Sequence, residues 1–134
     1  MKITRFEDLE CWKAARTLTK AIFFASNNGK LATDWDTRSQ LRRAAVSTMN
    51  NIAEGFARYH TKDFIRFLEI AQSSAAEVKS MLYLLEDIDY LDKPLLQELH
   101  QKTDILRKLT LGLIRYLNEN ATSLKPKHPN SKTL

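Results

Sequence analysis

The 134-residue sequence predicts an all-α protein folded as an antiparallel up-down-up-down four-helix bundle. Apolar residues recur at spacings of three and four in four segments, and capping or turn residues stand between these segments. Only three Gly and three Pro are present, so turns are few and the helices must be long. The short connections between the last three helices favour antiparallel neighbours that cross at about 20°.

The first helix is expected over residues 6–26. Its Asn-Asn-Gly end, 27–29, suits the left-handed geometry of a helix C-terminal cap. Residues 30–36 are expected to form a loop. The apolar stripe of this helix comprises Leu9, Trp12, Thr19 and Phe23.

The second helix is expected to start at Thr37, which forms a capping-box pattern with Gln40, and to stop at Gly55. Its apolar face comprises Leu41, Ala45, Thr48, Ile52 and Phe56. Its other side carries a polar line of Arg43, Ser47, Asn50 and Glu54. This line is either a solvated surface or, if buried, a set of groups that need partners.

The third helix, with Thr61 as its expected cap, has the clearest pattern in the chain. Its core seam comprises Phe64, Leu68, Ala71, Ala75, Val78, Leu82 and Leu85. A parallel row comprises Phe67, Ile70, Ser74, Glu77, Met81, Leu84 and Ile88. Because Glu77 stands within an apolar row, we expect it to pair with Arg42 or Arg43. We also expect a structural polar network of Asn51, Glu54, Ser74 and Glu77.

The fourth helix is expected to run to about residue 118, with Asp92 as its cap and Pro94 in its first turn. Leu109, Leu113 and Leu117 define its expected core side. Leu111 and Ile114 point elsewhere, as does Phe24 in the first helix. Such residues are either ordinary exposed hydrophobes or buried in a homo-oligomer.

Residues 1–120 are expected to form one domain, followed by a disordered basic tail over 121–134. Three of the 21 basic residues, Lys125, Lys127 and Lys132, belong to this tail, which leaves 18 basic against 16 acidic residues in the domain. The domain is thus nearly neutral, and a basic binding surface requires local clustering. A solvated tail is favoured over a dedicated binding arm.

The cellular location is expected to be cytoplasmic. The N-terminal residues are charged from Lys2 onward and lack the apolar region of a secretory signal. The apolar runs fall far below the ~20 residues that span a bilayer. A single cysteine, Cys11, forms no internal disulfide and suits a reducing compartment.

No catalytic, metal or cofactor site is expected, and the chain is interpreted as non-enzymatic. No glutamate is followed by histidine three residues later, as a di-iron bundle requires. The histidines at 60, 100 and 128 fall in a loop, on a helix face and in the tail, without metal-ligand spacing. The sequence also lacks a Gly-rich phosphate loop.

Basic residues are densest in the second helix and the connection that follows it. The candidate nucleic-acid-binding residues are Arg42, Arg43, Arg58, Lys62 and Arg66, with Tyr59 and His60 between them. Guanidinium groups and stackable rings suit RNA backbone and unpaired bases. An ordinary solvated helix junction explains the same pattern.

The chain is similar to a known family in the order of several motifs. These are Phe6-x-x-Leu9-x-x-Trp12, Gln40-Leu41-Arg42-Arg43-Ala44-Ala45-x-Ser47, Asn51-Ile52-Ala53-Glu54-Gly55, Phe67-Leu68-x-Ile70-Ala71 and Ser74-x-x-Glu77. They resemble the bacterial four-helix bundle proteins encoded by intervening sequences of large-subunit (23S) ribosomal RNA genes, over residues 6–117. In place of the Phe-Pro pair and acidic residue that precede the second helix in that family, this chain has residues 27–35 without proline.

The resemblance implies an antiparallel four-helix bundle that assembles into a homopentamer without demonstrated catalysis. A more distant resemblance, in fold only, is to the accessory variability determinant proteins of diversity-generating retroelements, which bind nucleic acid and a reverse transcriptase. Two functions follow as hypotheses. One is a homo-oligomeric bundle that binds ribosomal or other structured RNA through its basic residues. The other is an assembly or scaffold protein that binds a protein partner, with its arginines in structural ion pairs.

Overall fold

The computed structural model describes residues 2–120, and these residues contain helices and no strand. This confirms the predicted all-α class; the expected tail, 121–134, lies outside the described residues. The elements in chain order are a 3₁₀ turn η1 (Phe6–Asp8) and the helices α1 (Glu10–Ala25), α2 (Gly29–Thr33), α3 (Trp35–Phe56), α4 (Thr61–Asp87) and α5 (Lys93–Glu119).

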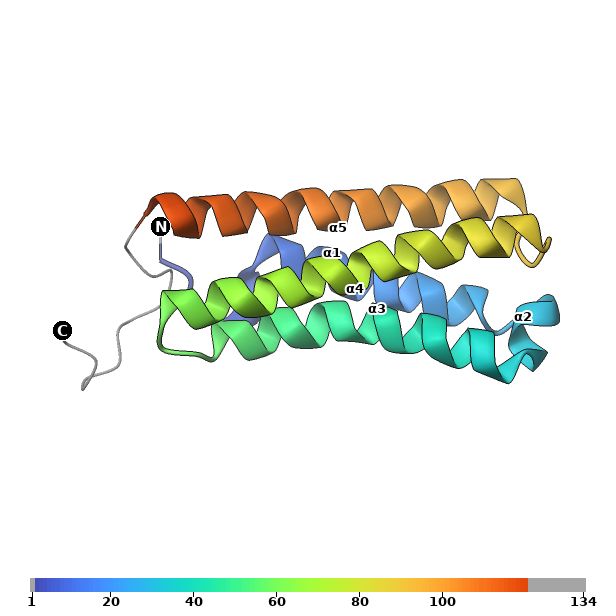
Figure 1. The fold of residues 1–134 in the computed structure, drawn as a ribbon, viewed down its shortest axis with the longest axis horizontal. Coiled ribbons are helices and arrows are strands. Elements are labelled where there is room, and N and C mark those ends of the chain that lie inside the picture. The colour runs from blue at the N-terminus through green and yellow to red at the C-terminus, as the bar shows by residue number, and fades with distance from the viewer. Residues whose placement is uncertain (1, 121–134) are drawn as a thin grey trace.

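The long helices α1, α3, α4 and α5 pack side by side as a helical bundle. Helix α3 contacts α1 and α4, and α5 contacts the same two helices, so α3 and α5 lie diagonally across the bundle. Consecutive long helices run in opposite directions (Figure 1). The short helix α2 packs on α3, at the end of the bundle where α4 turns into α5 (Figure 1).

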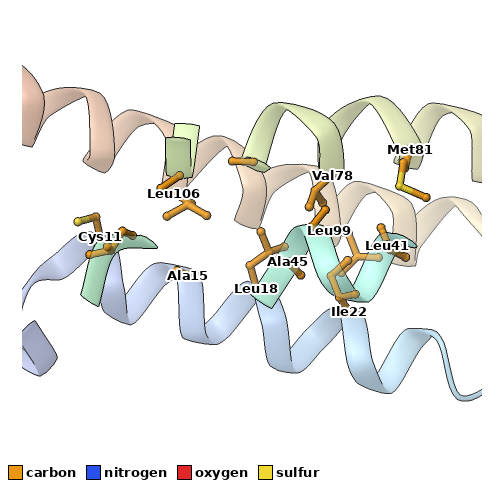
Figure 2. Packing of buried hydrophobic residues seen from close by; sticks show 14 of the residues in the cluster. Cys11, Ala15, Leu18, Ile22, Leu41, Ala45, Val78, Met81, Leu99 and Leu106 are labelled. Atoms are coloured by element: carbon orange, nitrogen blue, oxygen red, sulfur yellow. The ribbon is translucent and has the colours of Figure 1, made fainter. Parts of the chain in front are cut away.

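The core lies on the long axis of the bundle and contains side chains from all four long helices. Figure 2 shows Leu18 and Ile22 of α1 among side chains of the other helices, including Ala45, Val78 and Leu99. All seven residues of the predicted seam of α4 are buried, as are all five of the predicted apolar face of α3. These two faces are therefore confirmed by the structure.

The buried faces of α1 and α5 match the predicted stripes only in part: Leu9, Thr19 and Leu117 are buried as predicted. In α5, Leu109 is 37% exposed, whereas Ile114 is 8% exposed and Thr103 and Thr110 are buried. The hydroxyls of these threonines donate to the carbonyl oxygens of Leu99 and Leu106, at 2.7 and 2.8 Å. A threonine bonded in this way to its own helix is satisfied inside a core, so apolar spacing alone misplaces the face.

In α1 the buried stripe is built largely from small residues. Cys11, Ala15 and Ala25 are buried, together with Leu18 and Ile22, whereas the predicted Trp12 and Phe23 are only half-buried. Burial raises the pKa of the Cys11 thiol to about 12. Small residues on this stripe allow the other helices to approach α1 closely.

Gly55 was predicted to end the second helix, but it lies inside α3, which continues to Phe56. A Cβ atom at this position would stand 2.7 Å from Cβ of Phe67 and 3.0 Å from Cδ1 of Phe64. Gly55 is therefore required by the close approach of α3 to α4, not by a turn.

Several helix starts also differ from prediction. The expected loop over 30–36 contains α2, in which Leu31 is fully buried, and the left-handed backbone of this region is at Gly29, the first residue of α2, with φ of 62°. The cap of α3 is Asp34 and not Thr37, because the Asp34 carboxylate accepts the backbone N–H of Thr37 at 3.2 Å. Both residue types are good caps, so the sequence pattern did not separate them.

The remaining boundaries shift by a few residues or agree. Helix α1 begins at Glu10, after the 3₁₀ turn, instead of residue 6. The predicted cap of the third helix, Thr61, is wrong by one residue, because Thr61 is the first residue of α4 and His60 is its cap. The predicted cap of α5 is confirmed, because the Asp92 carboxylate accepts the backbone N–H of Leu95 at 3.0 Å, with Pro94 in the first turn.

Candidate nucleic-acid interface

The outer face of α3 forms a groove with a volume of about 540 Å³. Its lining consists of Phe23 from α1 together with Trp35, Arg38, Ser39, Arg42, Arg43, Val46, Ser47, Asn50 and Asn51 from α3. From Trp35 to Asn51 the helix rises roughly 24 Å, at about 1.5 Å per residue. The groove therefore follows α3 over most of its length.

The charge of the groove comes from three arginines, and none of the residues that line it is acidic. The Arg38 guanidinium carbon stands 5.2 Å from the centroid of the Trp35 ring, and that of Arg42 stands 4.3 Å from the Phe23 ring. The Arg43 guanidinium donates to the Ser39 hydroxyl at 2.9 Å and is exposed. Arg38 and Arg42 are thus held over aromatic rings by cation–π contacts, without a carboxylate in the groove to neutralise them.

Arg42 is the most constrained of the three arginines. It donates from Nε to the Ser26 hydroxyl at 2.7 Å, and from Nη2 to Asn27 Oδ1 at 2.7 Å and to the Phe23 carbonyl at 3.3 Å. Burial, and then the positive charge of Arg38, lower the pKa of Arg42 below its ordinary value. The guanidinium nevertheless stays protonated, so it adds a fixed positive charge and ties the end of α1 to α3.

Trp35 is the first residue of α3, and its side chain is 71% exposed. The helix start beneath it is fixed by the Asp34 carboxylate, which accepts the backbone N–H and the hydroxyl of Thr37 and, at 2.8 Å, the hydroxyl of Tyr90. Tyr90 follows α4 in the chain, so this bond joins the two connections at one end of the bundle. These contacts hold the base of an exposed indole in place.

Below the groove, a small polar network joins α3 to α4. The hydroxyls of Ser47 and Ser74 are 2.8 Å apart, and Asn51 Nδ2 donates to the carbonyl and hydroxyl of Ser47, both at 2.9 Å. Asn51 and Ser74, two members of the predicted network, are thus joined through Ser47. Glu54 instead forms an exposed ion pair with Arg58 at 3.0 Å.

Glu77 was predicted to pair with Arg42 or Arg43, and this is wrong. Glu77 is exposed, and within residues 2–120 its carboxylate forms no ion pair with either arginine. The second predicted apolar row of α4 is buried in some places and exposed in others. Ser74 is 9% exposed and bonds to α3 through Ser47, whereas Ile70 is 42% exposed. Glu77 lies seven residues after Ile70, on the same outer side of the helix.

The other predicted binding residues lie at the connection between α3 and α4. Arg58 and Arg66 stand over the Phe67 ring, at 4.8 and 5.9 Å from its centroid. Lys62 and Arg66 line a depression of about 270 Å³ that is also lined by Asp63 and Glu69. Acidic side chains therefore accompany the basic ones in this second cluster, unlike in the α3 groove.

The five predicted binding residues consequently form two separate groups. Between Arg43 and Phe56, the last residue of α3, the helix rises roughly 20 Å. Arg42 and Arg43 belong to the groove, whereas Arg58 belongs to the connection after α3, and Lys62 and Arg66 to the start of α4.

Residues 7–112 match the model of the 23S rRNA-intervening sequence protein family. The chain belongs to this family. The matched residues include every residue that lines the α3 groove and the whole second basic cluster. Membership thus covers the helical bundle and both candidate surfaces.

A crystal structure from Bacteroides thetaiotaomicron, described as a protein of unknown function from the S23 ribosomal protein family, is similar to this member of the family. The TM-score is 0.72 at 20% sequence identity, over 78% of this chain and 95% of the other. At this identity the match shows a shared fold. None of the curated proteins matches the chain.

Sequence reasoning found Arg42 and Arg43 but missed Phe23, Trp35 and Arg38 as parts of the same surface. Trp35 was placed in a loop, which hid its position one turn before Arg38 on a single helix. With α3 started at Trp35, the spacing of three residues would have placed the two side chains together. The contribution of Phe23 depends on packing between α1 and α3 and carries no local signal.

The described part of the chain holds no group of three or more histidine, cysteine or acidic side chains arranged to bind a metal ion. Within residues 2–120, no helix combines the length and the apolar character needed to cross a membrane.

Proposed function

We propose that this protein is a non-enzymatic, homo-oligomeric helical bundle of the cytoplasm that binds ribosomal or other structured RNA. The observation that supports this function is the α3 groove, where three arginines stand together and no carboxylate lines the surface. An uncompensated cluster of guanidinium groups attracts phosphates, and arginine contacts them in a bidentate manner. The second cluster, at Arg58, Lys62 and Arg66, is proposed to add backbone contacts.

The finer architecture belongs to the same proposal. The pairwise packing of the long helices supports a closed up-down-up-down four-helix bundle. The resemblance described above implies a homopentamer, and exposed apolar residues on α4 and α5 support self-association. The resemblance in fold to the accessory proteins of diversity-generating retroelements stays a prediction from the sequence. Such a resemblance would agree with nucleic-acid binding.

The first prediction concerns Arg43, whose guanidinium is exposed and has only a hydroxyl partner. We expect Arg43→Ala to weaken binding to fragments of 23S ribosomal RNA for all sequences tested. The slope of log affinity against log salt concentration should fall by about one, because one phosphate contact is lost. Filter binding or fluorescence anisotropy over a salt series measures both quantities.

Arg115→Ala is the matched control, because Arg115 is exposed on α5, diagonally across the bundle from the groove. Its affinity and slope should equal those of the wild type. Absence of binding at low salt, or binding that does not respond to salt, would contradict the proposed function.

The second candidate function is a scaffold that binds a protein partner, with its arginines in structural roles. The contacts of Arg42 with Ser26, Asn27 and Phe23 favour this candidate, because they serve the packing of α1 on α3. Arg42→Ala, measured in the same series, separates the two functions. Loss of stability or assembly, with RNA affinity unchanged by Arg43→Ala, would support the scaffold.

A further inference from the structure

The α3 groove combines an aromatic surface with cationic groups. The Trp35 side chain is 71% exposed at the start of the groove, although the helix beneath it is capped and bonded to Tyr90. An exposed indole on a fixed helix terminus offers a planar surface whose backbone attachment is already held in place. Binding of a flat ring to it costs little ordering of the protein.

Cationic groups follow this indole along the helix, on its C-terminal side. The Arg38 guanidinium lies 5.2 Å from the ring centroid, and Arg43 lies about one turn further along α3. Asn50 and Ser39 add amide and hydroxyl groups to the same lining. A ring platform, neighbouring guanidinium groups and a few neutral donors and acceptors are the elements that bind unpaired nucleotides.

A double helix makes poor use of such a surface. Its bases are stacked inside the duplex, so their faces do not reach a protein side chain, and double-stranded RNA is recognised through phosphates and 2′-hydroxyls over a wide area. The groove volume of about 540 Å³ falls within the range of sites for small ligands, which is about 300–1,000 Å³. This size suits one or two nucleotides rather than the side of a duplex.

We infer that the α3 groove binds an unpaired segment of RNA, with one base stacked on Trp35 and the adjoining phosphates held by Arg38 and Arg43. This inference rests on the proposed function and specifies it: the protein selects single-stranded loops or ends within a structured RNA. An acidic protein segment would use the guanidinium groups but not the flat, exposed face of the indole, so RNA is the favoured occupant.

The experiment uses the fluorescence of Trp35 in the full-length chain. The sequence contains two tryptophans, so Trp12→Phe leaves Trp35 as the only one. This background variant is titrated with a short oligoribonucleotide of mixed sequence, and separately with the same oligonucleotide annealed to its complement. We expect the single strand to quench Trp35 and to bind at least roughly tenfold more tightly than the duplex.

Trp35→Leu, in the wild-type background, keeps an apolar side chain but removes the ring. Because stacking of one base on an aromatic ring is substantial, affinity for the single strand should fall roughly 5- to 100-fold, as measured by anisotropy of a labelled oligonucleotide. Affinity for the duplex should not change. Trp35→Phe should restore part of the loss, and thermal melting of each variant checks that the fold is intact.

Different outcomes overturn different claims. Equal affinity for single strand and duplex, with Trp35→Leu neutral but Arg43→Ala weakening both, would remove the stacking site and leave RNA binding in place. If none of these RNAs shows salt-sensitive binding, both the stacking site and the proposed RNA binding are refuted. Quenching of Trp35 by a glutamate-rich helical peptide, with no response to RNA, would assign the groove to a protein partner.

Discussion

At the scale of single residues, the closest packing in the bundle depends on one missing side chain. Gly55 lies inside α3, where glycine is normally unfavourable, and the space above its Cα is filled by Phe64 and Phe67 of α4. The preference for alanine in a helix and the space available to it therefore act in opposite directions. Steric overlap at 2.7 Å with a Cβ atom attached to backbone is the larger effect.

Gly55→Ala is accordingly predicted to destabilise the protein. Overpacking of a tight contact costs about 1–3 kcal/mol, whereas alanine gains about 1 kcal/mol over glycine in a helix, so a net loss of about 1 kcal/mol, within a range of about 0–2 kcal/mol, is expected. Urea unfolding followed by circular dichroism measures this change. Gly112→Ala is the control, because no atom lies within 4 Å of the added Cβ, and it should stabilise the protein by about 0.5–1 kcal/mol. Equal effects of the two substitutions would refute the steric explanation.

At the scale of helices, Asp34 joins three elements at one end of the bundle. It follows α2, caps α3 and accepts a hydrogen bond from Tyr90, beyond α4. The Tyr90 hydroxyl first, and then the backbone N–H and hydroxyl of Thr37, hold the pKa of Asp34 below its usual value. Because all of these groups donate to the ionised carboxylate, the junction depends on the charge of Asp34.

We predict an acid-sensitive contribution to stability from this junction. The pKa of Asp34 is lower in the folded than in the unfolded chain, so its contribution is complete at neutral pH and is lost as the pH falls below about 4. Asp34→Asn keeps a cap residue that does not titrate. The wild type should therefore be more stable than Asp34→Asn at pH 7, and the difference should shrink by pH 3 in urea unfolding curves.

Tyr90→Phe tests the cause of this acid sensitivity. It removes the largest contribution to the lowered pKa of Asp34 but keeps the cap. Its pH dependence should fall between those of the wild type and Asp34→Asn. A constant stability difference between wild type and Asp34→Asn from pH 7 to pH 3 would show that the carboxylate charge has no part in the junction.

Helices also differ in how far the sequence predicts them. The face of α4 was predicted in full because apolar side chains occupy every buried position except Ser74, which adjoins the seam. The predicted face of α5 was displaced from the observed one, because Thr103 and Thr110 occupy core positions. Their hydroxyls donate to backbone carbonyl oxygens of the same helix. The candidate site was predicted at Arg42 and Arg43, but its aromatic part comes from α1 and from a helix start placed too late. Periodicity reports burial along one helix, whereas this groove depends on where two helices meet.

At the scale of the whole molecule, the described surface has two sides of different character. The basic groove follows α3, and α5 lies diagonally across the bundle from it. Eight of the eleven large exposed hydrophobic side chains of the described residues lie on α4, its C-terminal cap or α5. Four of these eight lie on α5, so self-association through α5 is predicted on the side opposite the groove, where assembly leaves the groove accessible.

The last prediction separates these two sides by mutation. On α5, Ile105, Leu109 and Tyr116 are 54%, 37% and 42% exposed and follow helical spacings of four and seven. We expect light scattering at micromolar concentration to give the wild type a mass above that of one chain, 15.5 kDa. Leu109→Glu should lower this mass toward that of the monomer, because a charge buried at an apolar contact is unfavourable. Trp35→Leu should leave the measured mass unchanged. A wild type that is strictly monomeric at micromolar concentration would contradict self-association. An oligomer that is disrupted by Trp35→Leu but not by Leu109→Glu would place the contact on α3.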